Sequence, residues 1–388
     1  MPLPLALYLH IPFCAVRCHY CDFNTYAGLA SYHEPYARSL SAEIRRAGEA
    51  RQRPSVRTIF LGGGTPTVLP AALLAEVLAA CREAFEVLPG AEVTCEANPG
   101  TADARLFADL AASGVNRLSM GVQSFDDAEL RWLGRIHDAG QAEAAFEAAR
   151  RAGFANINLD FIFGLPGQEL AMWERTLARA VALGPEHLSL YGLTVEHGTP
   201  LYNDVRLGRQ VQPDDDRAAD CYELALDRLA QAGYEQYEIS NWQRGDHACR
   251  HNLVYWRHEP YLGFGAGAHS FDGARRWWNV RPVPEYVARV GDGVSPMRDG
   301  ETVDVRLAMG EFMMLGLRLV AEGVAPARFE ARFGARGSAS IDAVFGEEVA
   351  GLVRRGLLER LPDRLRLTRA GRLLGNQVFA EFLEGSDP

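Results

Sequence analysis

The chain has 388 residues, of which 48% are hydrophobic and 23% charged, and its formal net charge is -10. This acidic balance argues against a general nucleic-acid-binding protein, because such proteins present a basic surface to phosphate. All 40 of the Lys or Arg positions are arginine, so a lysine Schiff base, a pyridoxal phosphate anchor and a Walker-type phosphate loop are excluded. The length predicts one large domain with a smaller one.

The seven cysteines are an odd number without the spacing of a disulfide framework, which argues against a disulfide-stapled secreted protein. Residues 1–13 lack the basic start of an export signal and are typical of a strand. The most apolar stretch, 305–320, is interrupted by Arg306, Glu311 and Arg318, well short of the ~20 apolar residues of a membrane span. We therefore expect a cytoplasmic protein with no transmembrane segment, and an amphipathic core helix at 305–320.

Along the chain, short β-rich segments alternate with amphipathic helical ones. The expected strands are Leu7 to Ile11, Thr58 to Leu61, Glu92 to Glu96, Arg117 to Val122, Ile157 to Phe163 and His187 to Leu193. The expected helices are Ala71 to Phe85, Ala104 to Ala112, Gln141 to Ala152 and Met172 to Leu183. This alternation predicts β/α units around a parallel sheet, with Glu235 to Ile239 as a further edge strand.

Three cysteines, Cys14, Cys18 and Cys21, form a C-x3-C-x2-C loop directly after the first expected strand. Three thiolates can hold three corners of a [4Fe-4S] cluster and leave its fourth iron open. On spacing alone, a zinc site or a disulfide with a spare thiol remains an alternative. The histidines that could complete a zinc site are His10, His19 and His33.

Glycines and polar side chains follow the ends of the next strands, where α/β folds place their active sites. Gly62 to Pro66 has the sequence GGGTP, and Glu96, Gln123 and Asp160 end or follow the later strands. Singly, each is better explained as a turn residue or a helix cap. Together, beside three thiols, they predict a cofactor site for a group that carries a cluster ligand, a ribose and an adenine.

These motifs resemble those of radical S-adenosylmethionine (SAM) proteins of the oxygen-independent coproporphyrinogen III oxidase-like family, over nearly the whole chain. The motifs are YLHIPFC at 8–14 with the two further cysteines, GGGTPT at 62–67, GVQSF at 121–125 and DFIFGLPGQ at 160–168. The resemblance implies a partial (β/α)6 TIM-like barrel of class α/β, with a [4Fe-4S] cluster on the three cysteines whose open iron chelates SAM. The resemblance places Tyr8 near the cluster. The SAM-binding residues that it implies are Gly63, Gly64 and Thr65 at the methionine part, and Glu96, Gln123, Arg135 and Asp160 at the remainder, with Asp160 as the ribose ligand.

Two departures separate the chain from the oxidases of this family. Phe23 stands where the oxidase-like motif C-x3-C-x2-C-x-C has a fourth cysteine. The segment 251–256, HNLVYW, is similar to the HNxxYW signature of the haem chaperone branch, HemW. Histidine is a ligand of haem iron, and tyrosine and tryptophan offer flat apolar surface to the macrocycle. We therefore expect His251 to bind haem.

The resulting hypothesis is a haem chaperone with a [4Fe-4S] cluster and SAM, which delivers haem to haem-accepting apoproteins such as membrane-bound respiratory enzymes. Whether it is also an enzyme stays open. One alternative is a coproporphyrinogen III oxidase of porphyrin biosynthesis, which decarboxylates propionates oxidatively. The other is a zinc-stabilised binding module without redox chemistry.

The C-terminal region is expected to be a helical, winged-helix-like accessory domain. It includes a hairpin, 357–360 with 364–368, and a helix over 369–383. From residue 301 onward, 12 arginines face 13 acidic residues, so the charge does not favour DNA binding. The expected division is 1–240 for the barrel, 241–303 for the haem motif and a linker, and 304–388 for the accessory domain.

Overall fold

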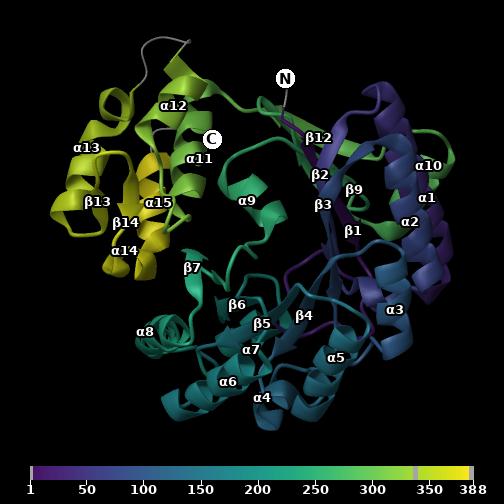
Figure 1. Cartoon of the computed structure of the whole chain (residues 1–388), viewed down its shortest axis with the longest axis horizontal. Helices are drawn as coiled ribbons and strands as arrows, with labels where there is room; N and C mark the ends of the chain where they lie inside the picture. Colours follow the sequence, from purple (N-terminus) through teal and green to yellow (C-terminus); the bar gives the residue numbers. More distant parts are fainter. Residues whose placement is uncertain (1–2, 335–339, 384–388) are drawn as a thin grey trace.

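The computed structural model describes residues 3–334 and 340–383, and these form a curved α/β sheet with a helical C-terminal domain beside it (Figure 1). The sheet is twelve-stranded over this part of the chain, with the order β12-β11-β10-β9-β1-β2-β3-β4-β5-β6-β8-β7. Every pairing from β9 through β1 to β6 is parallel, and the strands outside this block are antiparallel. This is the partial barrel of the predicted fold class.

All six expected strands are confirmed, with ends that shift by a few residues. They are β1 (Leu5–Ile11), β2 (Ser55–Gly63), β3 (Glu86–Ala97), β4 (Arg117–Gln123), β5 (Ile157–Phe163) and β6 (His187–Gly192). In β1, five of the seven residues are buried. Near-continuous burial of this kind is typical of parallel strands covered on both faces.

The helices that connect these strands lie on the outer side of the sheet (Figure 1). They are α1 (His33–Ala50), α2 (Ala71–Ala84), α3 (Ala104–Ala112), α4 (Asp127–Trp132), α5 (Ala139–Arg151), α6 (Leu170–Leu183) and α8 (Asp215–Gln231), with the 3-10 turns η1 (Ala30–Tyr32) and η2 (Pro66–Val68). The start of α5 is set by a capping box between Asp138 and Gln141. The four helices expected from the sequence are confirmed.

The sheet extends past β1 by strands that the sequence did not predict. They are β9 (Tyr261–Phe264), β10 (His269–Phe271), β11 (Arg275–Asn279) and β12 (Met297–Thr302), and with them come α9 (Arg250–Trp256) and α10 (Val283–Gly291). Much of the segment expected as a linker is therefore part of the sheet. The strands are short, and β12 is polar and mostly exposed, so its sequence carries no alternating apolar pattern.

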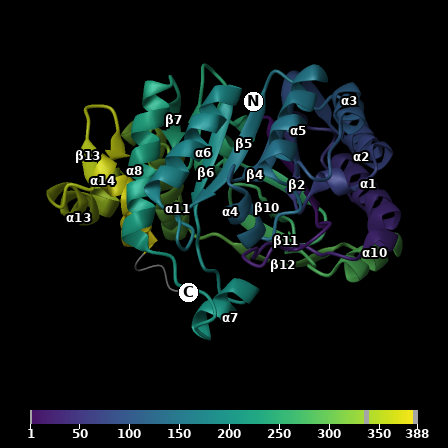
Figure 2. The same ribbon diagram turned by 90° about the horizontal axis from the view of Figure 1, so that it is seen from below.

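At the other side of the sheet, β7 (Glu235–Glu238) is the edge strand, as expected. The short β8 (Asn241–Gln243) lies between β7 and β6 and was not anticipated. The helix α7 (Pro200–Arg206) stands apart from the helices that cover the sheet (Figure 2). Its Leu201 N–H donates to the carbonyl of His19 at 3.0 Å, which places α7 against the cysteine loop.

The C-terminal domain has a hydrophobic core of its own, which includes Phe312, Phe329, Phe345 and Phe382. Its elements are α11 (Val305–Leu317), α12 (Pro326–Phe333), α13 (Ile341–Arg354), β13 (Leu358–Arg360), β14 (Leu365–Leu367), α14 (Arg369–Leu373) and α15 (Gly375–Leu383). The hairpin is confirmed. None of the helices in the described ranges is both long and apolar enough to cross a membrane.

Two helix predictions in this domain need correction. The helix expected over 369–383 is two helices, because Leu374 leaves the helical conformation between them, with φ -105° and ψ 26°. The core helix expected over 305–320 ends at Leu317. The parts of the accessory-domain prediction that fall on 335–339 and 384–388 lie outside the described residues.

Candidate functional site

The cysteine loop follows β1 and folds back on itself through backbone hydrogen bonds. Cys14 N–H donates to the carbonyl of Tyr26 at 3.0 Å, and Cys21 N–H donates to that of Cys18 at 3.2 Å. The thiols of Cys14, Cys18 and Cys21 are free and partly exposed. All three line one cavity of about 530 Å³, so the loop presents them to a common space.

The glycine run after β2 packs directly against this loop. Gly64 N–H donates to the carbonyl of Ile11, and Thr65 N–H donates to that of Phe13, both at 2.8 Å. A Cβ at Gly64 would lie 2.6 Å from the Phe13 oxygen, closer than real contacts allow. Gly63 has φ +111°, which favours glycine. The glycines thus let the backbone approach both the cysteine loop and the cavity.

Residues on and after the later strands complete the same cavity. Glu96, Gln123, Arg135 and Asp160 line it together with Gly63, Gly64 and Thr65. The Arg135 guanidinium donates to the Gly121 carbonyl at 2.8 Å and lies 3.6 Å from the Cys18 sulfur. Gln123 has φ +70°, at an irregularity in the β4–β5 register, which is a strained backbone of the kind found at functional sites.

Hydrogen bonds fix the position of the Asp160 carboxylate. It accepts from Ser119 Oγ at 3.1 Å and from Asn158 Nδ2 at 2.8 Å. Burial nevertheless raises its pKa. Burial, followed by the negative charge of Asp160, raises the pKa of Glu96 to about 8. The cavity therefore holds two carboxyl groups that a bound polar or cationic ligand would help to ionise.

A second cavity of about 630 Å³ adjoins the first. The two share a wall, to which Asp22, Phe23, Gly63 and Glu96 contribute. The side chain of Phe23, which replaces the oxidase-like cysteine, is 64% exposed. Besides Phe23, the aromatic and imidazole groups that line the second cavity are Tyr8, His10, Tyr255, Tyr261, His269 and Trp278. Tyr8 thus lines the second cavity and not the first.

The three histidines considered for a zinc site have other contacts. His10 Nδ1 bonds the Tyr8 hydroxyl at 2.9 Å, its Nε2 bonds the Asn24 carbonyl at 3.0 Å, and burial lowers its pKa to about 4. His19 packs on Trp132, and His33 packs on Phe13. Within 3–334 and 340–383, no three His, Cys, Asp or Glu side chains are gathered closely enough to hold a single metal ion.

His251 lies behind the second cavity and does not line it. It is 1% exposed, with Nδ1 at 2.9 Å from Thr58 Oγ1 and Nε2 at 2.9 Å from the Tyr255 hydroxyl. Burial lowers its pKa to about 3, so the ring is neutral. Its two nitrogens are therefore both engaged, and its hydrogen bond to Tyr255 reaches the cavity wall.

The buried carboxylate of Glu92 binds the N-terminus of helix α9, which carries His251. Glu92 accepts from the backbone N–H groups of Arg250 and His251, both at 3.0 Å. Its side chain is only 4% exposed. An acceptor at the first N–H groups of a helix satisfies donors that have no partner within the helix. Strand β3 thereby fixes where the histidine lies.

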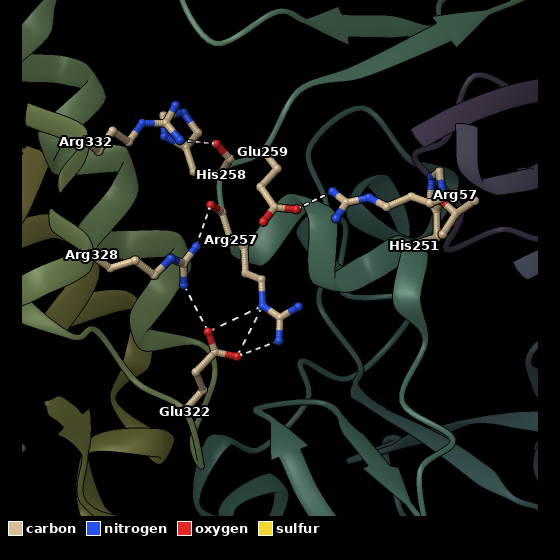
Figure 3. A network of polar contacts seen from close by, with 9 residues as sticks. Arg57, His251, Arg257, His258, Glu259, Glu322, Arg328 and Arg332 are labelled. Carbon is tan, nitrogen blue, oxygen red and sulfur yellow. Dashed lines mark hydrogen bonds and ion pairs between the residues drawn. The ribbon is translucent and has the colours of Figure 1, made fainter. Parts of the chain in front are cut away.

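The residues that follow α9 form ion pairs and hydrogen bonds with the C-terminal domain (Figure 3). Glu322 pairs with Arg257 at 2.7 Å and with Arg328 at 2.9 Å. Arg328 also donates to the Arg257 carbonyl at 2.9 Å, and Arg332 donates to the His258 carbonyl at 2.7 Å. Because α9 lies between the sheet and the C-terminal domain (Figure 1), this network connects the second cavity's wall to that domain.

Comparison with known proteins matches both parts of this architecture. The Radical SAM superfamily matches residues 8–180, and the HemN C-terminal domain matches residues 304–374. The heme chaperone HemW of Bacillus subtilis is 39% identical over 97% of this chain and 98% of its own length. The chain belongs to the HemW family of radical SAM proteins. The HemW of Escherichia coli K12 is 36% identical over 98% of both chains.

The fold of this HemW family member is also that of a solved enzyme. The structure of coproporphyrinogen III oxidase (HemN) from Escherichia coli, described as a radical SAM enzyme, superimposes with a TM-score of 0.84. It is 25% identical, and the match covers 98% of this chain and 90% of the oxidase.

Several residues of these cavities escaped the sequence analysis. Ser119 and Asn158, which hold Asp160, lie on strands with no motif signal of their own. His269 and Trp278 face the second cavity from β10 and β11, strands that the sequence did not predict. The His, Trp and Arg residues between 269 and 281 were the available signal. Their position at the cavity could not be inferred, because it depends on β9, which pairs with β1 on one side and with β10 on the other.

Proposed function

We propose that this chain is a haem chaperone that holds a [4Fe-4S] cluster and SAM in the first cavity and haem in the second. The observation that carries the proposal is the shared wall of the two cavities, one lined by three free thiols and the other by aromatic rings and imidazoles. Cavities of several hundred Å³ that are rich in aromatic side chains are typical of sites for large cofactors.

The thiols of Cys14, Cys18 and Cys21 would hold the cluster, since three thiolates are the protein ligands of such a centre with one open iron. When bound, the cluster supplies that open iron and a transferable electron. The Arg135 guanidinium would offset the negative charge of the Cys18 thiolate beside it. Because these thiols must stay reduced, we place the protein in a reducing compartment, the cytoplasm.

For SAM, we propose that Asp160 accepts hydrogen bonds from the ribose, since Ser119 and Asn158 hold its carboxylate at the cavity. Gly63, Gly64, Thr65, Glu96 and Gln123 would offer further contacts to SAM. Tyr8 would act from the second cavity, close to the shared wall. These residues lie on or directly after neighbouring parallel strands, and a ligand usually binds near the C-terminal ends of such strands.

For haem, the relatives named heme chaperones and the aromatic lining of the second cavity support the proposal. Both ring nitrogens of His251 are hydrogen-bonded and the residue does not line the cavity, so direct ligation would break one of these bonds and require the buried ring to move. We therefore propose that His251 instead positions Tyr255 in the wall. In this proposal, residues 1–240 bind the cluster and SAM. Residues 241–303 contribute most of the side chains that line the haem cavity, and residues 304–388 form the domain that contacts this segment. The recipients would be haem-accepting apoproteins such as membrane-bound respiratory enzymes.

The alternative is a coproporphyrinogen III oxidase, which the structural match to HemN favours. Phe23 counts against it, because an aromatic side chain at the shared wall cannot supply the thiol that oxidase-like chains have there.

An anaerobic assay with coproporphyrinogen III, SAM and a reductant, run beside a haem titration of the same preparation, separates the two functions. We expect stoichiometric haem binding, haem transfer to an apo-haemoprotein and no release of carbon dioxide. SAM-dependent decarboxylation would instead establish the oxidase.

A further inference from the structure

Two histidines line the second cavity, and they differ in what their ring nitrogens contact. His10 has both nitrogens bonded, to Tyr8 and to Asn24. His269, on β10, is exposed, and neither of its ring nitrogens has a hydrogen-bond partner within the described ranges. Iron needs an imidazole nitrogen with a free lone pair. Of the two, only His269 offers one without rearrangement.

The surroundings of His269 suit a flat macrocycle. Its ring stacks on Trp278, with centroids 5.5 Å apart and planes 25° from parallel. The two residues are directly paired across the β10–β11 ladder, so the backbone fixes their relation. Tyr255 and Tyr261, in edge contact at 4.7 Å, line the same cavity. Aromatic faces of this kind pack against an apolar ring system.

A positively charged side chain, that of Arg281, also lies at this cavity. Arg281 lines it, and its exposed guanidinium forms no ion pair or hydrogen bond with any described residue. Its backbone is held, because its carbonyl accepts from Asn24 Nδ2 at 3.1 Å and from the Tyr26 hydroxyl at 3.2 Å. A free guanidinium on a fixed backbone is suited to binding a carboxylate.

We propose that His269 is the axial ligand of the haem iron and that Arg281 pairs with a haem propionate. This inference rests on the proposed haem-binding function and assigns its ligands. His251, in this assignment, is a positioning residue that acts through Tyr255.

The test is an anaerobic titration of the full-length protein with haem, followed by the Soret spectrum and the dissociation constant. We expect His269→Ala to lose the wild-type Soret band and to weaken binding by about tenfold or more. Added imidazole should restore the band, and His269→Met should shift it, because the ligand atom changes from nitrogen to sulfur. A restored band also excludes a folding defect.

Two histidine controls accompany these variants. His197→Ala removes an exposed histidine beside an aromatic ring, Tyr202, that does not line the second cavity, and it should leave spectrum and affinity unchanged. His251→Ala should weaken binding but keep the position of the Soret band, since the ligand stays. A wild-type spectrum in His269→Ala, with loss of the band in His251→Ala, would overturn the assignment.

The Arg281 contact is tested with a haem whose propionates are blocked. Arg281→Ala should weaken haem binding several-fold without moving the Soret band, and it should not affect binding of the haem dimethyl ester. An equal loss for both ligands would refute the ion pair. Failure of the wild-type protein to bind haem at all would refute the proposed function itself, a result that differs from a wild-type protein that binds haem without His269.

Discussion

The carboxylate of Glu96 accepts a hydrogen bond from the backbone N–H of Gly63 at 3.1 Å, and both residues line both cavities. The third strand and the glycine run after the second strand are therefore joined at the point where the two cavities meet. A ligand in either cavity would contact Gly63 and Glu96, which also line the other cavity.

The first prediction concerns the pH dependence of stability through Glu96. Its folded pKa of about 8 is raised above the ordinary value of 4.5, so ionisation at higher pH favours the unfolded chain. The free energy of unfolding that Glu96 contributes should be intact below pH 4.5 and fall as the pH rises to 8. Glu96→Gln should remove this slope, so the difference in melting temperature between variant and wild type should grow from pH 5 to 8. A constant difference would show that Glu96 titrates normally.

The second prediction concerns the metal. Anaerobic reconstitution should yield about four irons and four acid-labile sulfides per chain, because the three thiols share one cavity. Alanine at Cys14, Cys18 or Cys21 should remove the cluster absorbance, whereas Cys81→Ala, a buried cysteine away from the cavity, should retain it. Stoichiometric zinc without sulfide would favour the zinc-stabilised binding module instead.

The third prediction separates SAM binding from cluster binding. Asp160→Ala should weaken SAM affinity and keep the iron content, since Asp160 has no contact with the thiols. Gly64→Val should lose both, because its side chain would collide with the Phe13 carbonyl next to Cys14. Isothermal titration with SAM and an iron assay on each variant measure the two effects. Iron loss in Asp160→Ala would make that residue structural.

The fourth prediction compares two ion-pair contacts of the C-terminal domain, one with Glu238 of β7 and one with Arg257, which follows α9. Arg318 lies over the Trp256 ring at 4.4 Å and pairs at 3.4 Å with Glu238, whose side chain is fully buried. Arg318→Ala removes the cationic partner of that buried carboxylate, which keeps its hydrogen bonds from Ser240 and Asn241, and should cost about 3 kcal/mol of unfolding free energy. Glu322→Gln breaks pairs that are a third exposed and should cost about 1 kcal/mol or less. Urea denaturation gives both values, and equal costs would contradict the role of burial.

The features that the sequence determined by itself depend on residues close together in the chain. The cysteine spacing, the glycines of 62–64 and the six strands of the barrel depend on neighbouring residues. Short runs of apolar and β-branched residues mark the parallel strands, because both faces of these strands are covered. Glu96 and Gln123, near the ends of β3 and β4, and Asp160, within β5, line one cavity because these strands are parallel neighbours in the sheet. For this reason the three thiols, the glycines and the polar groups on β3 to β5 could be predicted for the first cavity, whereas Ser119 could not, and Tyr8 lines the second cavity instead.

What only the tertiary structure decided is the second cavity. His251 and His269 are both histidines near aromatic residues in the sequence, and nothing local tells which one has free ring nitrogens. For His251, the answer depends on hydrogen bonds with Thr58 of β2 and Glu92 of β3, which are more than 150 residues away in the sequence. For His269, it depends on the pairing of β9 with β1, which places β10 at the cavity. Such pairings are set by packing and backbone hydrogen bonds between distant segments, and strands as short as β9 and β10 leave no alternating pattern in the sequence.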